Sequence, residues 1–331
     1  MKAMVIRKFG GPEIFEPADV PQPDVRPGHV LVRVAASSVN PVDQKIRSGA
    51  VPGIAADFPA VLHGDVAGTV EAVGEGVAHL RPGDEVYACA GGVKGFGGAL
   101  AEFMLADAAL VARKPASLGM LAAATLPLVG ITAWESLVDR ARVEPGQRVL
   151  IHGGAGGVGQ IAVQLARQCG AIVHATVSTE EKAKIVRSLE ADHAILYRQQ
   201  SVEDYVRQYT GGAGFDVVFD TVGQNNLPNS FAAVRQGGTV VTIAARVTAD
   251  LGPLHNKGAT LHTVLMLLPL LTGQGRPHHG DILVRLARLV DAGRVKPLLD
   301  PETFSFRDVS AGHRKLESGQ VVGKLALEAR F

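Results

Sequence analysis

The sequence contains little cysteine, few aromatic residues and almost no net charge. Its 331 residues include two cysteines, Cys89 and Cys169, one tryptophan and 5% aromatic residues. Two cysteines without metal-ligand spacing argue against a disulfide framework and favour a reducing compartment, so we expect a cytoplasmic protein. A formal net charge of +1 gives no electrostatic basis for binding nucleic acid or an anionic membrane surface.

Long hydrophobic runs are also missing. The most apolar stretch, residues 261–271, is interrupted by His262 and Pro269. It is shorter than the roughly 20 apolar residues that span a bilayer, so we interpret it as a buried strand or an interface element and expect no membrane partner. The short apolar stretch between Lys2 and Arg7 is not typical of a signal peptide. At roughly 150 residues per domain, the length predicts about two domains.

The first part of the chain, up to about residue 115, carries β-strand signals. Apolar or β-branched runs at 30–34, 67–74 and 84–88 are separated by turn signals such as Pro27-Gly28. This punctuation predicts a barrel-like or sandwich domain. Near the other end, the spacing predicts an amphipathic helix over 281–291 and a strand over 321–327, and we expect this tail to pack back onto the first domain.

Strand and helix signals alternate from Leu118 to about residue 260. Strands are predicted at 149–151, 172–176, 194–196, 217–219 and 239–243, and helices at 158–169 and 182–189. Parallel strands that are buried on both faces have short, fully apolar sequences. The pattern therefore predicts a doubly wound parallel sheet.

A glycine-rich turn joins the first of these strands to the first helix. Residues 154–159 read Gly-Ala-Gly-Gly-Val-Gly and fit the pattern G-x-G-x-x-G. The pattern follows a strand, opens a periodic helix and precedes a second strand, which is the context that a dinucleotide site requires. Glycines let the backbone approach a pyrophosphate, and the helix N-terminus offers free N–H groups. A merely tight turn is the alternative interpretation.

The end of the second strand indicates which dinucleotide binds. An NAD site usually has Asp or Glu here to bond the ribose hydroxyls. This chain instead has Ser178 and Thr179, which can donate hydrogen bonds to a 2′-phosphate, and Lys182 supplies a positive charge. Glu180 and Glu181 follow, and as the first residues of a helix they complement its dipole. We therefore predict NADPH as the cofactor.

Several further segments accompany this turn along the chain. They are residues 39–43, 64–70, 73–77, 81–86, 153–159 and 220–223. In this order and spacing, essentially the whole chain resembles the medium-chain dehydrogenase/reductase superfamily. Within it, the chain resembles the zinc-independent quinone oxidoreductase (zeta-crystallin-like) and enone reductase branch.

The resemblance implies an α/β fold with two domains. A GroES-like, β-rich catalytic domain would comprise residues 1–120 and be completed by 266–331, and a Rossmann domain would comprise 121–265. The cofactor would lie between them. The resemblance also implies homodimers joined through an edge strand of the Rossmann sheet, a place that residues 261–266 fit.

The resemblance further implies roles for individual residues. Gly156, Gly157 and Val158 would contact the pyrophosphate, and Ser178, Lys182 and Tyr197 would surround the 2′-phosphate. Asn40 and Thr132 would lie near the nicotinamide, and Val222 and Ile243 along the cofactor. For Tyr197, a half-buried aromatic at a strand end is the alternative interpretation.

Zinc-binding members of the superfamily have ligands at places where this chain differs. They have Cys in the segment matching Asn40 and His-Glu in the segment matching Gly64-Asp65, and a four-Cys lobe for a second zinc. Catalytic zinc needs three protein ligands. Here Asn40 and Gly64 replace ligands, and His63 is one residue away, which on an extended segment reverses the side-chain direction. His278-His279 has no partners at ligand spacing and is interpreted as a solvated loop, so we expect no zinc site.

Without a Lewis acid, interconversion of alcohols and ketones is poorly supported, because the alkoxide lacks stabilisation. Hydride transfer from NADPH to a quinone or to an α,β-unsaturated carbonyl needs only hydrogen-bond donors and a proton. Asn40 and Lys45 are the candidate catalytic residues, Lys45 because an ammonium stabilises enolate charge or donates a proton. A solvated surface lysine is the alternative for Lys45. Alcohol or aldehyde dehydrogenation and nucleotide binding with little turnover are the competing functions.

Overall fold

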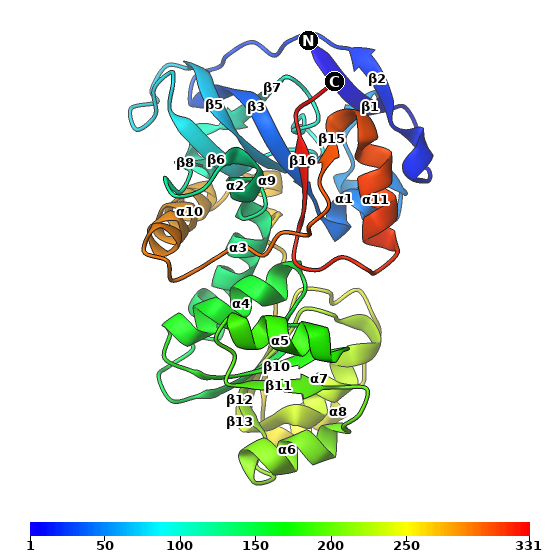
Figure 1. Ribbon diagram of the computed structural model, residues 1–331, viewed down its shortest axis with the longest axis vertical. Helices are drawn as coiled ribbons and strands as arrows, with labels where there is room; N and C mark the ends of the chain where they lie inside the picture. Colours follow the sequence, from blue (N-terminus) through cyan, green and yellow to red (C-terminus); the bar gives the residue numbers. More distant parts are fainter. The chain divides into compact units, whose positions relative to one another are not determined.

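The computed structural model describes residues 1–331 and divides them into two compact units (Figure 1). We call Met1–Leu128, Leu267–Gly293 and Pro297–Phe331 the terminal unit, because it contains both chain ends. Val129–Met266 and Arg294–Lys296 form the central unit. The chain passes from the terminal unit to the central unit within one helix, α3 (Pro127–Trp134), which continues as a π-helical turn over Glu135–Arg140.

The terminal unit is built on a seven-stranded sheet. Its strand order is β15-β16-β3-β5-β6-β8, and β7 also pairs with β3. The strands are β3 (His29–Val39), β5 (Asp65–Val73), β6 (Glu85–Cys89), β7 (Phe103–Asp107), β8 (Val111–Arg113), β15 (Phe304–Ser305) and β16 (Leu325–Glu328). A smaller sheet comprises β1 (Lys2–Ile6), β2 (Glu16–Asp19) and β4 (Ala60–Val61). The prediction of a β-rich first domain is confirmed.

The C-terminal tail packs back onto the start of the chain, as predicted. Strand β16 pairs antiparallel with β3, with Leu325 opposite Val39, and the red β16 lies beside the blue β3 in Figure 1. The helices of this unit are α1 (Pro41–Arg47), α2 (Met120–Ala123), α9 (Leu268–Thr272), α10 (Arg276–Asp291) and α11 (Val309–Glu317). The tail therefore completes the sheet from which the first half of the chain starts.

The interpretation of His278-His279 as a solvated loop is wrong. Helix α10 begins at Arg276, and His279 is buried within it. Pro277 suits the first turn of a helix, where its missing N–H has no partner to lose. Gly280 lets the helix approach the backbone closely, because a Cβ there would lie 2.4 Å from the carbonyl oxygen of Ala109. His278 and His279 therefore belong to the start of a helix that packing stabilises, although their polar sequence is typical of a loop.

The central unit contains the predicted parallel sheet. All six strands are parallel, in the order β11-β10-β9-β12-β13-β14. The strands are β9 (Arg148–His152), β10 (Ile172–Val177), β11 (His193–Leu196), β12 (Phe215–Asp220), β13 (Val234–Thr242) and β14 (Thr260–Thr263). The helices are α4 (Gly157–Gln168), α5 (Glu180–Ser188), α6 (Val202–Thr210), α7 (Leu227–Ala233) and α8 (Gly252–Lys257). The strand order reverses at β9, and such switch points are where doubly wound sheets bind ligands.

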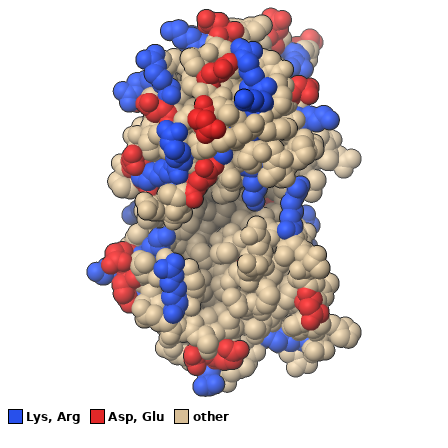
Figure 2. All heavy atoms as spheres, turned by 90° about the vertical axis from the view of Figure 1, so that its right-hand side faces the viewer, with Lys and Arg blue, Asp and Glu red and all other residues tan.

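The apolar stretch 261–271 is only partly buried. It comprises the edge strand β14, a turn and α9, with Leu270 buried but Leu265 and Leu268 about half exposed. A different segment, Met120–Arg140, has the length and apolar composition to cross a membrane, but 67% of its apolar window is buried inside the fold. That burial is typical of a core helix. On the face in Figure 2, Lys and Arg side chains lie among Asp and Glu side chains, in keeping with the small net charge.

Candidate functional site

The glycine-rich turn links β9 to α4 in the central unit. Gly153 has a φ of 72°, a left-handed conformation that favours glycine. A Cβ on Gly154 would lie 2.7 Å from the Cβ of Ala175, and one on Gly159 would lie 2.2 Å from the carbonyl oxygen of Gly153. The turn thus requires glycine for backbone geometry and for close packing against β10. Gly157 and Val158 form the first turn of α4, after Gly156 at the N-cap.

The N-terminus of α4 has no side-chain cap. The first N–H groups of a helix have no acceptor within the helix, and they carry the positive end of its dipole. Here no Ser, Thr, Asp or Asn occupies the N-cap position to accept from them, because that residue is Gly156. The arrangement suits a pyrophosphate, which brings its own oxygen acceptors.

The loop after β12 is fixed beside this turn by Asp220. One oxygen of its carboxylate accepts the N–H groups of Val222 and Gly223, at 2.9 and 2.7 Å, and the other accepts the hydroxyl of Ser230 at 2.8 Å. Thr221 Oγ1 donates to the carbonyl of His152, the last residue of β9, at 2.6 Å. The side chain of Val222 is 54% exposed as a result, which leaves an apolar surface at the carboxyl edge of the sheet.

Two other expected site residues also lie in the central unit: Ile243, expected along the cofactor, and Thr132, expected near the nicotinamide. Ile243 follows β13, is half-buried, and donates its N–H to the carbonyl of Asp220. Val222 and Ile243 therefore come from the ends of neighbouring strands. Thr132 is buried in α3, and its carbonyl accepts the Ser136 hydroxyl at 2.7 Å.

The residues expected around a 2′-phosphate follow β10 and β11. Val177 and Leu196 are paired in register, and the N–H of Tyr197 donates to the carbonyl of Val177, so Ser178 and Tyr197 begin adjacent loops. The hydroxyl oxygen of Thr179 caps α5 by accepting the N–H of Lys182 at 3.3 Å. Tyr197 is 50% exposed. The structure thus brings Ser178, Thr179, Lys182 and Tyr197 to one edge of the sheet.

Arg198 is a cation at this edge that the sequence reasoning missed. Its guanidinium carbon lies 5.9 Å from the centre of the Tyr197 ring, and the side chain is exposed. Its place directly after Tyr197 is the signal that could have indicated it. Glu180 and Glu181 lie in the first turn of α5, as expected, where they complement the helix dipole. A hydrogen bond to its own backbone N–H, aided by Thr179, lowers the pKa of Glu181.

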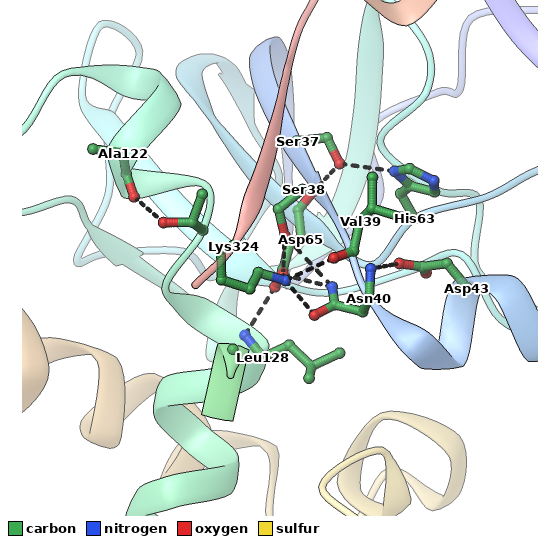
Figure 3. A network of polar contacts seen from close by, with 12 residues as sticks. Ser37, Ser38, Val39, Asn40, Asp43, His63, Asp65, Ala122, Leu128 and Lys324 are labelled. Carbon is green, nitrogen blue, oxygen red and sulfur yellow. Dashed lines mark hydrogen bonds and ion pairs between the residues drawn. The ribbon is translucent and has the colours of Figure 1, made fainter. Parts of the chain in front are cut away.

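Asn40 lies in the terminal unit, at the start of α1, inside a closed polar network (Figure 3). The side chain is 0% exposed. Its amide nitrogen donates to Asp65 Oδ2 at 2.8 Å, and its amide oxygen accepts from the ammonium of Lys324. Its backbone N–H donates to Asp43 Oδ2 at 2.8 Å, which completes a capping box for α1. Neither end of the amide is free.

Asp65 and Lys324 are the charged centre of this network, and Figure 3 shows them pointing toward Asn40. Lys324 Nζ donates to the carbonyl of Val39 at 3.0 Å and lies 3.7 Å from Asp65 Oδ2. Burial lowers the pKa of Lys324, and the nearby carboxylate of Asp65 opposes that effect. The sequence reasoning missed Lys324, although a lysine within the apolar run 321–327 was a signal.

His63 does not lie on an extended segment as expected. Its φ of 71° is left-handed, and β5 begins only at Asp65. The ring points to His313 of α11, with Nε2 to Nε2 at 2.9 Å, and burial lowers the pKa of both rings. The Nε2 atom of His63 is therefore already occupied by a hydrogen bond within the protein.

The residues present do not fit a zinc ion. The structure contains no group of three or more His, Cys, Asp or Glu side chains that could hold a metal. Gly64 offers no side chain, His63 bonds to His313, and the buried ammonium of Lys324 lies beside Asp65. An ammonium at this place repels a second cation. Burial raises the pKa of the Cys89 thiol. Burial is also the main reason that the pKa of Asp43 is raised to about 7.

Lys45 has an exposed side chain on α1. Asp43, Ile46 and Arg47 of the same helix are buried. Lys45 is two residues from Asp43, which on an α-helix corresponds to nearly opposite faces. The structure therefore places the two candidate catalytic residues differently, with Asn40 inside the network and Lys45 in solvent.

Comparisons with known proteins agree with this geometry. Residues 26–116 match the alcohol dehydrogenase GroES-like domain, and residues 189–327 match a family described as zinc-binding dehydrogenase. The chain is 35% identical to the chloroplastic NADPH-dependent alkenal/one oxidoreductase of Arabidopsis thaliana, over 99% of this chain and 79% of that protein. It is 33% identical to the quinone oxidoreductase of Homo sapiens, over 99% and 97%.

The chain belongs to the medium-chain dehydrogenase/reductase superfamily. The Escherichia coli quinone oxidoreductase in complex with NADPH has a TM-score of 0.89 to this medium-chain dehydrogenase/reductase, at 27% identity over 99% of this chain and 100% of that one. The resemblance to the quinone oxidoreductase and enone reductase branch is therefore confirmed. The zinc-binding description of one matching family does not suit the donor set of this chain, in which Asn40, Gly64 and Lys324 occupy the place considered for a metal.

Proposed function

We propose that this protein is an NADPH-dependent oxidoreductase that reduces quinones or α,β-unsaturated carbonyl compounds without zinc. One observation carries the proposal: the nucleotide-binding edge of the central unit combines an uncapped, glycine-rich helix start with Ser178, rather than an acid, after β10. A carboxylate there would repel a 2′-phosphate. The names of the relatives, which include an NADPH-dependent alkenal/one oxidoreductase and a quinone oxidoreductase, support the same assignment.

The cofactor edge of the proposed site belongs to the central unit. Gly156, Gly157 and Val158 would hold the pyrophosphate through backbone N–H groups. Ser178, Thr179, Lys182 and Tyr197 would hold the 2′-phosphate through hydroxyl and ammonium groups. Val222 and Ile243 would offer apolar surface along the cofactor, and Thr132 would serve the nicotinamide end.

NADPH supplies a hydride when it is bound, and the protein supplies orientation and charge stabilisation. In a quinone or an enone, the electron pair that arrives on carbon is accommodated by the conjugated oxygen. That oxygen needs hydrogen-bond donors and, finally, a proton. Lys45 is the candidate donor, because it carries an ammonium and its side chain is exposed on α1.

Asn40 fits a different role from Lys45. Because its amide is buried and bonded at both ends, we propose that Asn40 serves the nicotinamide end of the site by fixing the backbone at the start of α1. Orientation of the cofactor and the substrate is a large part of the catalysis that such a site can supply.

One assay separates this function from its competitors. The purified protein is given NADPH with a set of quinones, alkenals and simple ketones and with no acceptor, and NADH is run in parallel. We expect oxidation of NADPH only with quinones or alkenals, and much slower oxidation of NADH. Activity confined to simple ketones would support the alcohol dehydrogenase alternative. Tight NADPH binding without turnover on any acceptor would support a nucleotide-binding protein.

The assembly and location of the protein are also proposals. The edge strand β14, with the half-exposed Leu265 after it in the same unit, supports a homodimer joined through this edge. An edge strand with exposed leucines is a template for pairing with a second chain. The molar mass in solution, measured by light scattering, tests this. The two unpaired cysteines support a cytoplasmic location.

A further inference from the structure

Four distant parts of the terminal unit meet at a single buried ammonium. Lys324 precedes β16, Val39 and Asn40 join β3 to α1, Asp65 begins β5, and Leu128 lies in the first turn of α3. Hydrogen bonds and one ion pair connect all of them. We call this group the Lys324 clamp, and Figure 3 shows its members converging.

The two charges of the clamp are fully buried. The side chains of Lys324 and Asp65 are 4% and 0% exposed. Removing such groups from water costs several kcal/mol per ion unless each charge has a partner and its remaining donors or acceptors are bonded. Lys324 has the oxygens of Asn40 and Val39 as well as Asp65, so the ammonium has acceptors in several directions.

Both oxygens of Asp65 are also in use. Oδ2 accepts Ser38 Oγ at 2.6 Å and the amide of Asn40 at 2.8 Å. Oδ1 accepts the backbone N–H of Leu128 at 2.8 Å. Leu128 is the second residue of α3, so Asp65 caps that helix from another part of the chain and places a negative charge at the positive end of its dipole.

We propose that Lys324 is a positioning residue for the reaction: its ammonium holds Asn40 and Asp65 so that Asp65 fixes the first turn of α3. That helix is the one through which the chain enters the cofactor-binding central unit, and it carries Thr132. Lys324 thus connects the polar groups at the start of α1 to the helix that contributes to the nicotinamide end of the proposed site.

The contacts of the Lys324 clamp determine the choice of the test variant and of its control. Lys324→Met keeps the apolar stem and removes the ammonium, and it leaves Asp65 as an unpaired buried charge. Lys257→Met is the matched control, because the Lys257 ammonium also donates to backbone carbonyls, those of Phe231, Ala232 and Val234, but has no carboxylate partner. Both variants lose a lysine that holds backbone oxygens, and only the first loses the clamp.

The first measurement is hydrogen exchange of the full-length protein, well below the unfolding midpoint. In Lys324→Met we expect the first turn of α3 to exchange about tenfold faster, because the Leu128 N–H loses a fixed acceptor. Peptides of α10 should be unchanged. In Lys257→Met we expect no change in α3. If α3 exchanged in the Lys324→Met variant at the same rate as in the wild type, the proposal would be overturned.

The second measurement is steady-state kinetics, and it rests on the proposed quinone or enone reduction. For Lys324→Met we expect kcat to fall about tenfold while the Kd for NADPH changes little, because alignment is lost rather than cofactor binding. Lys257→Met should keep the wild-type kcat. A folded Lys324→Met variant with wild-type kcat would refute a positioning role. If wild-type protein reduces no acceptor at all, the proposed function fails, and the exchange result still decides the clamp.

A double variant covers the case in which Lys324→Met does not fold. Asp65→Asn together with Lys324→Met removes both buried charges, and a buried neutral pair is tolerated better than a lone charge. We expect the double variant to regain a cooperative unfolding transition but not the wild-type exchange of α3 or the wild-type kcat. Recovery of both would show that Lys324 only balances charge, and would overturn the proposal.

Discussion

His313 Nε2 lies 2.9 Å from His63 Nε2, although 250 residues separate the two histidines in the sequence. The other nitrogen of His313 accepts from the guanidinium of Arg47 at 3.2 Å, because an arginine can only donate. His313 must therefore donate through Nε2 to His63, whose Nδ1 then donates to Ser37 Oγ at 3.4 Å. The Ser37 hydroxyl donates a hydrogen bond to the backbone carbonyl of Asp65 at 2.7 Å. One guanidinium thus fixes the tautomers of two neutral histidines.

These two rings and two further buried histidines, His152 and His174, predict that the protein loses stability as the pH falls. Burial lowers the pKa of His313 to about 3, lowers that of His63 well below its usual value, and lowers those of His152 and His174 to about 4. The unfolded chain binds protons on these rings below about pH 6.5, whereas the folded chain does not, so the free energy of unfolding falls as the pH drops from about 7 toward 4. A ring that takes up a proton only in the unfolded chain contributes at most about 1.4 kcal/mol per pH unit in this window. Asp43 acts in the opposite sense, because its folded pKa is raised to about 7, but it is one group against four.

The contribution of the histidine pair can be measured with His313→Gln. A glutamine can accept from Arg47 and donate to His63, so it can replace the hydrogen bonds without taking up a proton. We expect the slope of unfolding free energy against pH, from urea titrations between about pH 7 and 5, to decrease by the equivalent of about one proton. The m-value should stay constant as a control for the unfolded state. A slope identical to that of the wild type would show that His313 does not carry this dependence.

The parts of the fold that could be predicted from the sequence depend on neighbouring residues. The helix after the glycine-rich turn and the strand before it follow from local periodicity, and Gly154 and Gly159 are needed because β9, β10 and α4 pack closely around them. The start of α10 could not be predicted, because His278 and His279 look solvated unless one knows that Gly280 packs against Ala109.

The centre of the terminal unit was harder to predict than the cofactor edge. The contacts of Lys324 with Asn40 and of His313 with His63 join residues more than 200 positions apart, and they exist only once β16 has paired with β3. The apolar run 321–327 around Lys324 is a local signal, but the residues near Lys324 in the sequence do not indicate that Asp65 is its partner. Asn40 could be recognised from its segment, but its closed hydrogen bonds depend on the same distant partners.

Lys45→Ala tests whether the exposed lysine of α1 takes part in the reaction. If the ammonium stabilises charge on the substrate oxygen, we expect kcat with enones to fall at least about tenfold while the Kd for NADPH is unchanged. Lys8→Ala, which removes another exposed lysine of the terminal unit, is the control and should keep the wild-type kcat. Turnover of Lys45→Ala equal to that of the wild type would return Lys45 to the solvated surface.

The choice between NADPH and NADH should depend on the edge formed by Ser178, Lys182 and Arg198. Ser178→Asp places a carboxylate where we propose that the 2′-phosphate binds, so we expect the Kd for NADPH to rise by about tenfold or more and the preference for NADPH over NADH to shrink. Lys182→Ala and Arg198→Ala should each weaken the binding of NADPH and leave the binding of NADH nearly unchanged. The effect should become smaller at high salt, because these cations are accessible to solvent. Lys184→Ala is the matched control, since Lys184 lies on the same helix with its side chain exposed. Binding is followed by fluorescence of the reduced cofactor, which needs no substrate. Equal losses for both cofactors in Arg198→Ala would place this arginine at a part that the two cofactors share, and an unchanged Kd would remove it from the site.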